Sequence, residues 1–162
     1  MGNAKKPLLN MKKIFIGFIS LVILSLFSCD KEEYPERPIS ELEIWNCYSQ
    51  SVWDNNKINN ELIGKWQWVY SINYWNPDKG WNTENENTMI EFFNDSTLNL
   101  IVNNEIINTA KWTIAIKDVQ LYGLVLDVSI SQLYGRIIIC EDILEFNNSY
   151  IDGSDNYFIK IK

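Results

Sequence analysis

The residues of this chain that could perform acid–base or metal chemistry are carboxylates, because the sequence contains no histidine. That absence excludes Ser-His-Asp and Cys-His catalytic arrangements and removes the usual zinc ligands. Two pairs of acids stand close together, Glu141 with Asp142 and Asp152 with Asp155. Paired carboxylates can hydrolyse glycosides, but adjacent acids at a turn are more often solvated surface or a weak calcium site. We therefore predict a non-enzyme without catalytic residues, metal or cofactor.

The second group that could do chemistry is the thiol of Cys29, which directly follows a hydrophobic stretch. Residues 14–27 are apolar apart from one glycine and two serines, and two lysines precede them. A basic start, a short apolar core and a small-residue exit are typical of a secretory signal peptide. The stretch is shorter than the about 20 residues that a membrane-spanning helix needs. We expect residues 1–28 to be a signal peptide; Met11 begins a well-proportioned signal, so residues 1–10 are either an upstream start-codon error or a harmless extension.

The residues Leu26-Phe27-Ser28-Cys29 resemble the lipobox of bacterial lipoproteins. The resemblance implies cleavage before Cys29 and attachment of lipid chains such as palmitate to it. Several chains anchor stably, since each buried methylene contributes about 0.8 kcal/mol. The segment Asp30-Lys31-Glu32-Glu33, with three acids, resembles the export signal of Bacteroidetes surface lipoproteins, although an acidic linker would look the same. We expect attachment through Cys29 to the outer membrane of a Gram-negative bacterium, on the cell surface; a membrane-spanning helix or a free thiol is the alternative.

The charge of the chain argues against nucleic acid as a partner. The net charge is −7, and loss of the four lysines before Cys29 leaves ten basic residues against 21 acidic ones, a net charge of −11. Such a surface repels polyanions. Residues 29–40 carry two prolines and mixed charge, and we interpret them as a tether.

Cys47 and Cys140 remain once Cys29 is acylated. Exported chains favour disulfides. A bond between these two would close a long loop, worth about 4–5 kcal/mol in the chain-entropy model. The sequence cannot fix the distance between the two residues, so pairing and two free thiols both stay open.

Hydrophobic residues alternate with polar ones over most of residues 62–162, which predicts β-strands. The predicted strands are 62–74, 88–93, 97–102, 105–116, 121–130, 134–140, 142–146 and 157–161. Eight short strands joined by short turns favour an all-β fold, either an antiparallel up-and-down barrel or a tightly curled sandwich. We favour the barrel, because pairing of the last strand with the first removes both sheet edges. For the pre-barrel segment 41–61 we expect a short helix across one barrel end.

The segment Leu62-Ile63-Gly64-Lys65-Trp66 resembles the Leu-x-Gly-x-Trp opening of lipocalin-like domains. Residues 87–104 and the ending around Asp152-Gly153 also resemble the Bacteroidetes lipocalin-like lipoproteins, so the resemblance covers about residues 61–162. It implies a barrel that can bind a small ligand. We expect Gly64 to let the strand bend and Trp66 to fill the closed barrel end.

Two tryptophans, Trp75 and Trp81, lie in a polar loop after the first predicted strand. With Tyr70 and Tyr74 they are our candidate ligand-binding residues, a stacking surface for a sugar ring or an apolar ligand; alternatively they plug the barrel. The leading hypothesis is a small apolar or amphipathic ligand in or at the mouth of the barrel. The alternative is a barrel whose core aromatics fill it, with loops that bind a protein or glycan.

Overall fold

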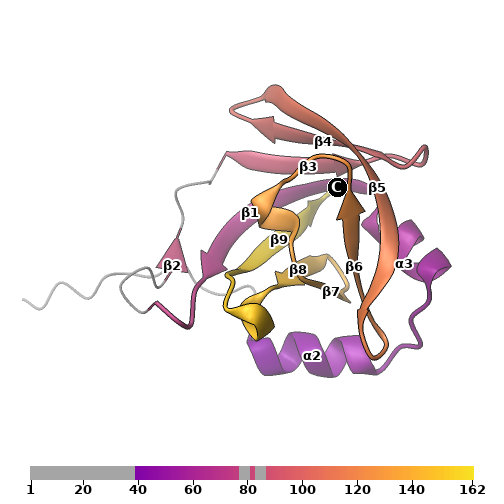
Figure 1. Cartoon of the computed structure of the whole chain (residues 1–162), viewed down its shortest axis with the longest axis vertical. Helices are drawn as coiled ribbons and strands as arrows, with labels where there is room; N and C mark the ends of the chain where they lie inside the picture. Colours follow the sequence, from indigo (N-terminus) through magenta and orange to yellow (C-terminus); the bar gives the residue numbers. More distant parts are fainter. Residues whose placement is uncertain (1–38, 77–80, 83–86) are drawn as a thin grey trace, which may run out of the picture. The chain divides into compact units, whose positions relative to one another are not determined.

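The computed structural model describes residues 39–76, 81–82 and 87–162, and most of these form a nearly closed barrel of eight antiparallel strands with two short helices (Figure 1). The predicted signal peptide, Cys29 and nearly all of the tether lie outside the described residues. In chain order the elements are α2 (Glu41–Ser49), α3 (Asn55–Leu62), β1 (Gly64–Ile72), β2 (Trp81–Asn82), β3 (Thr88–Phe92), β4 (Thr97–Val102), β5 (Glu105–Asp118), β6 (Leu121–Leu126), the 3-10 turn η2 (Ser131–Leu133), β7 (Arg136–Cys140), β8 (Ile143–Asn147), the 3-10 turn η3 (Ser149–Ile151) and β9 (Asp155–Ile161).

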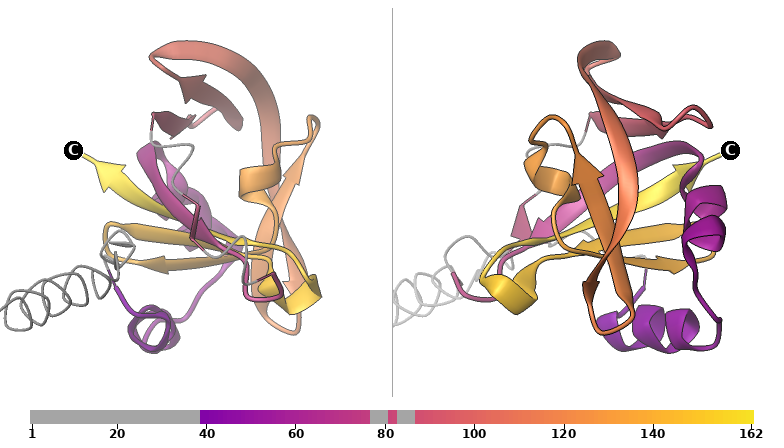
Figure 2. Two further views of the ribbon diagram at one scale, coloured as in Figure 1. Left: turned by 90° about the vertical axis from the view of Figure 1, so that its left-hand side faces the viewer. Right: turned by 45° about the vertical axis from the view of Figure 1, so that its right-hand side comes forward.

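The strands follow one another around the barrel in an up-and-down order. The hydrogen-bonded order is β6-β5-β4-β3-β1-β9-β8-β7, and the short β2 pairs with the end of β1. β1 pairs with β3 on one side and with β9 on the other, so the predicted closure between first and last strands is confirmed. β6 and β7 are the two ends of this order and pack against each other. Figure 2 shows β5 curving over from β4 towards β6.

Large side chains fill the inside of the barrel. On β1 every second residue from Trp66 to Ile72 is buried, as the alternation predicted. The largest fully buried side chains are Trp66, Trp68, Tyr70, Tyr157, Phe92, Phe146 and Phe158. Trp66 is a core residue: its indole Nε1 donates to the carbonyl of Leu62 across 2.7 Å. A core of this kind stabilises the barrel through apolar burial.

Helix α2 lies against the outside of β7, beneath the barrel in the view of Figure 1. Ser40 begins the helix with a reciprocal cap: its hydroxyl accepts from the Glu43 amide, and the Glu43 carboxylate accepts from the Ser40 amide. Ile44 and Tyr48, four residues apart on one helix face, pack on Ile138 of β7. The structure also joins Cys47 of α2 to Cys140 of β7 in a disulfide.

Several predicted strand boundaries differ from those of the structure, among them the start of β1, the end of β6 and the start of β7. Leu62 is the last residue of α3, and β1 begins at Gly64, whose φ of +118° breaks the helix. β6 ends at Leu126, although the predicted strand ran to residue 130. β7 begins at Arg136 instead of residue 134, because Gly135 has a φ of +110°. At Gly64 and Gly135 the positive φ sets a strand boundary that the hydrophobic pattern alone does not show.

Candidate ligand-binding pocket

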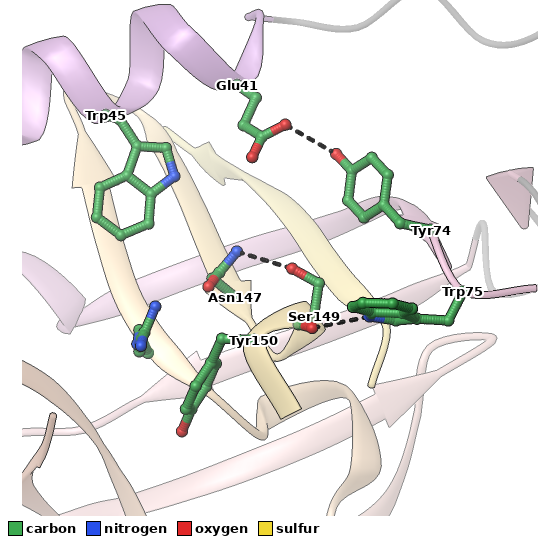
Figure 3. Close-up of a pocket in the computed structure, with 8 residues that line it drawn as sticks. Glu41, Trp45, Tyr74, Trp75, Asn147, Ser149 and Tyr150 are labelled. Atoms are coloured by element: carbon green, nitrogen blue, oxygen red, sulfur yellow. Dashed lines mark hydrogen bonds between the residues drawn. The ribbon is translucent and has the colours of Figure 1, made fainter. Parts of the chain in front are cut away.

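A pocket of about 350 Å³ lies between the start of α2, the chain after β1, and η3 (Figure 3). It lies beside the barrel wall and not inside the barrel. Its volume is at the small end of the range for sites that take small molecules. Its lining combines four aromatic rings with charged and polar groups: Glu41, Trp45, Tyr74, Trp75, Arg136, Asn147, Ser149 and Tyr150.

Two of the predicted site residues, Tyr74 and Trp75, form one wall of this pocket. The Tyr74 hydroxyl donates to Glu41 Oε2 across 3.2 Å, and the Trp75 indole Nε1 donates to the carbonyl oxygen of Ser149 across 2.9 Å. The Asn73 side chain accepts from the backbone amide of Trp75 at 3.1 Å, which fixes the turn. The Tyr74 hydroxyl and the Trp75 indole nitrogen are thus held by hydrogen bonds. The two residues nevertheless remain 44% and 66% exposed.

The other two predicted residues behave differently. Tyr70 has no exposed surface and stacks on Tyr157, with ring centroids 4.6 Å apart, so it belongs to the core and does not line the pocket. Trp81 belongs to β2, where its backbone pairs with Ile72 of β1. The side chain of Trp81 lies outside the described part of the structure.

The opposite wall is built around Arg136 at the start of β7. Its guanidinium lies 3.7 Å from the ring centroid of Tyr150 and makes an ion pair with Asp118 of β5. The Arg136 side chain is 17% exposed. A guanidinium stacked on an aromatic ring and paired with a carboxylate is held rigidly. This wall is therefore preformed in the absence of a ligand.

Asn147 of the pocket lining is bonded to a buried acid, Glu145, that sequence reasoning did not single out. Asn147 Nδ2 donates to Glu145 Oε1 across 3.0 Å and to Ser149 Oγ across 3.4 Å. Glu145 has no exposed surface. It is paired in register with Ile138 of β7, so it points to the face that α2 covers. Burial raises the pKa of Glu145 to about 7, and the hydrogen bond from Asn147 partly opposes the shift.

The two carboxylate pairs noted in the sequence differ in burial. Glu141 and Asp142 lie in the β7–β8 turn, where Asp142 pairs with Lys162 at 2.7 Å, as expected for surface acids. Asp152 is exposed, but Asp155 has no exposed surface. The expectation of a solvated acid at Asp155 is therefore wrong.

Asp155 has a local structural task beside the pocket. Its Oδ1 accepts from the backbone amides of Asn148 and Ser149 at 2.6 and 2.7 Å. Burial raises the pKa of Asp155, while these hydrogen bonds lower it. The carboxylate thereby fixes the start of η3, which carries Ser149 and Tyr150 into the pocket wall.

Sequence reasoning missed Trp45, Arg136, Asn147 and Tyr150, because they come from four elements that meet only in the folded chain. Within the described part of the chain, no cluster of acids and cysteines could hold a metal ion. Nor does the described part contain a helix long and apolar enough to cross a membrane. No family model matches the chain, and no curated protein or solved structure shows significant similarity to it.

Proposed function

We propose that this protein is a lipid-anchored, lipocalin-like binding protein of the bacterial cell envelope. It takes a small amphipathic molecule, such as one or two sugar rings, in the pocket between α2 and η3. The observation that carries the proposal is the lining of this pocket, where exposed faces of Tyr74 and Trp75 stand beside the side chains of Glu41 and Asn147. Aromatic faces pack against the apolar face of a ring, and the polar groups bond its hydroxyls.

The filled core supports a site on the outside of the barrel. Trp66, Trp68 and Phe158 occupy the interior with at most 1% exposure, and a barrel of eight strands has room for side chains or one small ligand but not both. The acidic surface and the carboxylate of Glu41 favour a neutral or cationic ligand over an anion.

The anchor is proposed from the sequence features at Cys29. The test is metabolic labelling of the full chain with a palmitate analogue in a Gram-negative host, followed by membrane fractionation. The wild type should carry the label and sediment with outer membrane, and Cys29→Ser should do neither. An unlabelled wild-type chain would refute the lipid anchor and would leave the proposal about the pocket unaffected.

The pocket is tested by a glycan array and by native mass spectrometry of the protein purified from its own host. Trp75→Ala removes the stacking face and should abolish binding, whereas Trp75→Phe keeps a ring and should retain most of it. Trp81→Ala, in the same loop, asks whether the second tryptophan contributes. Ile107→Ala, on an exposed site of β5 away from the pocket, is the matched control. Equal array signals from wild type and Trp75→Ala would remove this pocket from the function.

A second candidate function is binding of a macromolecular partner through the β5–β6 hairpin. This hairpin exposes Ile116, Val119 and Val125 by 66%, 86% and 48%. Exposed apolar residues gathered on one hairpin are typical of interaction surfaces. Cross-linking on intact cells should capture a partner that Val119→Lys loses and Trp75→Ala keeps; the reverse pattern would favour the pocket.

A further inference from the structure

A second, larger pocket of about 600 Å³ lies at the other end of α2. The end of the helix, the connection to α3 and the β5–β6 turn enclose it. Its lining residues are Trp45, Tyr48, Ser49, Ser51, Val52, Trp53, Gln120, Leu121 and Tyr122. None of these side chains is charged, in a protein where 22% of residues are. The volume falls within the range of small-molecule sites.

The aromatic wall of this pocket is held rigidly. Tyr48 and Trp53 stack in parallel with ring centroids 4.7 Å apart, and Trp45 meets Tyr48 edge-on at 6.4 Å. The Trp53 indole Nε1 donates to the carbonyl of Tyr48 at 2.7 Å. The disulfide at Cys47, next to Tyr48, ties this part of α2 to β7. A wall fixed in this way does not have to be ordered when a ligand arrives.

Charge is kept on the far side of the wall. The ammonium of Lys57 lies 4.4 Å from the ring centroid of Trp53 and does not line the pocket. Because Tyr48 stacks on one face of Trp53, the ammonium must cover the other. The pocket lining therefore consists of aromatic, aliphatic and neutral polar side chains, without a formal charge.

One polar group within the wall lacks a partner. The Tyr48 side chain is 94% buried, and its hydroxyl has no hydrogen-bond partner among the described residues. Burial raises the pKa of Tyr48 to about 12, so the hydroxyl keeps its proton at neutral pH. Leaving such a group unpaired in the interior is unfavourable. The oxygen exposes less than 1 Å², so a ligand with an acceptor atom reaches it only after a side-chain movement that opens it to the pocket, and would then recover part of that cost.

We propose that this pocket is a second binding site, separate from the first, for an uncharged ring-bearing molecule whose carbonyl or ether oxygen accepts a hydrogen bond from Tyr48. A charged ligand would leave water without finding a counter-charge, which is unfavourable. The proposal does not depend on the first pocket. Trp45 lines both pockets, so it is not used to tell them apart.

The probe is 6-propionyl-2-dimethylaminonaphthalene, a neutral fluorescent ketone whose emission shifts to the red when its carbonyl accepts a hydrogen bond. Its anionic counterpart carries a carboxymethyl group in place of one N-methyl. The full wild-type chain should bind the neutral dye saturably, and the anionic dye at least about tenfold more weakly, a difference of about 1.4 kcal/mol. Equal affinity for the two dyes would overturn the proposal.

Three variants locate the dye. Tyr48→Phe should weaken binding about five- to tenfold and shift the bound emission to the blue, because the donor is gone. Ser51→Trp fills the pocket and should abolish the saturable signal. Trp75→Ala, in the first pocket, should leave it unchanged. Dye that binds elsewhere on the surface gives the same signal in the wild type and the variants. It therefore does not contribute to the difference between them.

The Tyr48→Phe variant should fold, because the hydroxyl that it removes has no hydrogen-bond partner among the described residues. Removing an unpartnered buried hydroxyl leaves no group unsatisfied, so Tyr48→Phe should be at least as stable as the wild type in urea unfolding. A stable Tyr48→Phe variant with unchanged affinity and emission would refute the role of the hydroxyl. Unchanged binding in Ser51→Trp would refute the site.

Discussion

Asn147 Nδ2 donates a hydrogen bond to Oε1 of Glu145 across 3.0 Å, and so links an amide that lines the first pocket to a carboxyl group with no exposed surface. The same amide reaches Ser149 Oγ at 3.4 Å, on the turn that accepts the hydrogen bond of Trp75. The pocket floor is thus a short polar chain over a buried acid. A change in the protonation of Glu145 acts on groups that a ligand would touch.

The first prediction concerns pH. Burial raises the pKa of Glu145 from an ordinary value near 4.5 to about 7. Between these two pH values Glu145 is protonated in the folded state and ionised in the unfolded chain. The contribution of Glu145 to stability is therefore lost as the pH rises from about 4.5 to about 7, on the order of 3 kcal/mol in all. Glu145→Gln keeps an oxygen for Asn147 and removes the charge. This variant should match the wild type near pH 4.5 and exceed its free energy of unfolding at pH 8.

Urea unfolding between pH 4.5 and 8 measures this difference. Glu105→Gln, at an exposed site on β5, is the control and should follow the wild type throughout. Comparison of variant with wild type is needed because Asp155 also has a raised pKa, and Glu43 and Asp95 have lowered ones that act in the opposite sense. A gap between Glu145→Gln and wild type that stays constant across the range would refute the assignment.

Strands such as β1 could be predicted because their alternation marks one face in the core. On β1 the alternation of Trp66, Trp68 and Tyr70 with polar residues marked the buried face directly, and Tyr157–Ile161 at the end of the chain matched it as a closing partner. The predicted helix in residues 41–61 proved to be two helices. The capping pair Ser40 and Glu43 was a readable signal for the first of them.

The pocket could be predicted only in part, because its walls depend on register and docking. Tyr74 and Trp75 stood out as aromatics in a polar loop. Glu145 gave no sign of burial, since its position under α2 follows from pairing with Ile138 and from where the helix lies. That position in turn depends on the contact between Cys47 and Cys140, which no local pattern specifies.

The second prediction concerns Asp155, whose Oδ1 accepts two backbone amides at the start of η3. Asp155→Ala leaves both donors unpaired and should cost about 2–3 kcal/mol of stability. Asp155→Asn keeps an acceptor and should cost less. It should also lower the pKa of Glu145, because the Asp155 charge is among the causes that raise it. A carboxyl-carbon NMR titration of Glu145 in wild type and Asp155→Asn measures the shift, and a higher pKa in the variant would contradict the prediction.

The third prediction concerns the disulfide. Cys47 and Cys140 are separated by 93 residues, and a loop of that length is worth about 4–5 kcal/mol in the chain-entropy model. A reductant should lower the free energy of unfolding of the wild type by about this amount, seen as a lower urea midpoint. It should leave the Cys47→Ala/Cys140→Ala double variant unaffected. Both pockets lie along α2, so binding of the ketone dye should weaken in parallel. A double variant as stable as the oxidised wild type would show that the bond constrains little.

The fourth prediction compares two glycines with similar backbone angles and different surroundings. Gly64 and Gly135 have φ of +118° and +110°, so alanine is strained at both, by about 1–2 kcal/mol. A Cβ at Gly64 would meet Lys160 Cε at an ordinary 3.5 Å, whereas at Gly135 it would stand 2.1 Å from the backbone oxygen of Asn147. That oxygen cannot move away freely, because Asn147 pairs with Arg136 in the β7–β8 ladder.

Gly64→Ala should therefore fold with a small loss of stability, and Gly135→Ala should lose more than about 3 kcal/mol or fail to accumulate as soluble protein. Because the clash falls on the pair that joins two pocket residues, any Gly135→Ala that folds should also bind the pocket ligand more weakly. Soluble yield followed by urea unfolding decides between the two glycines. Equal losses at both positions would mean that backbone strain alone governs them and that the close approach at Gly135 relaxes without cost.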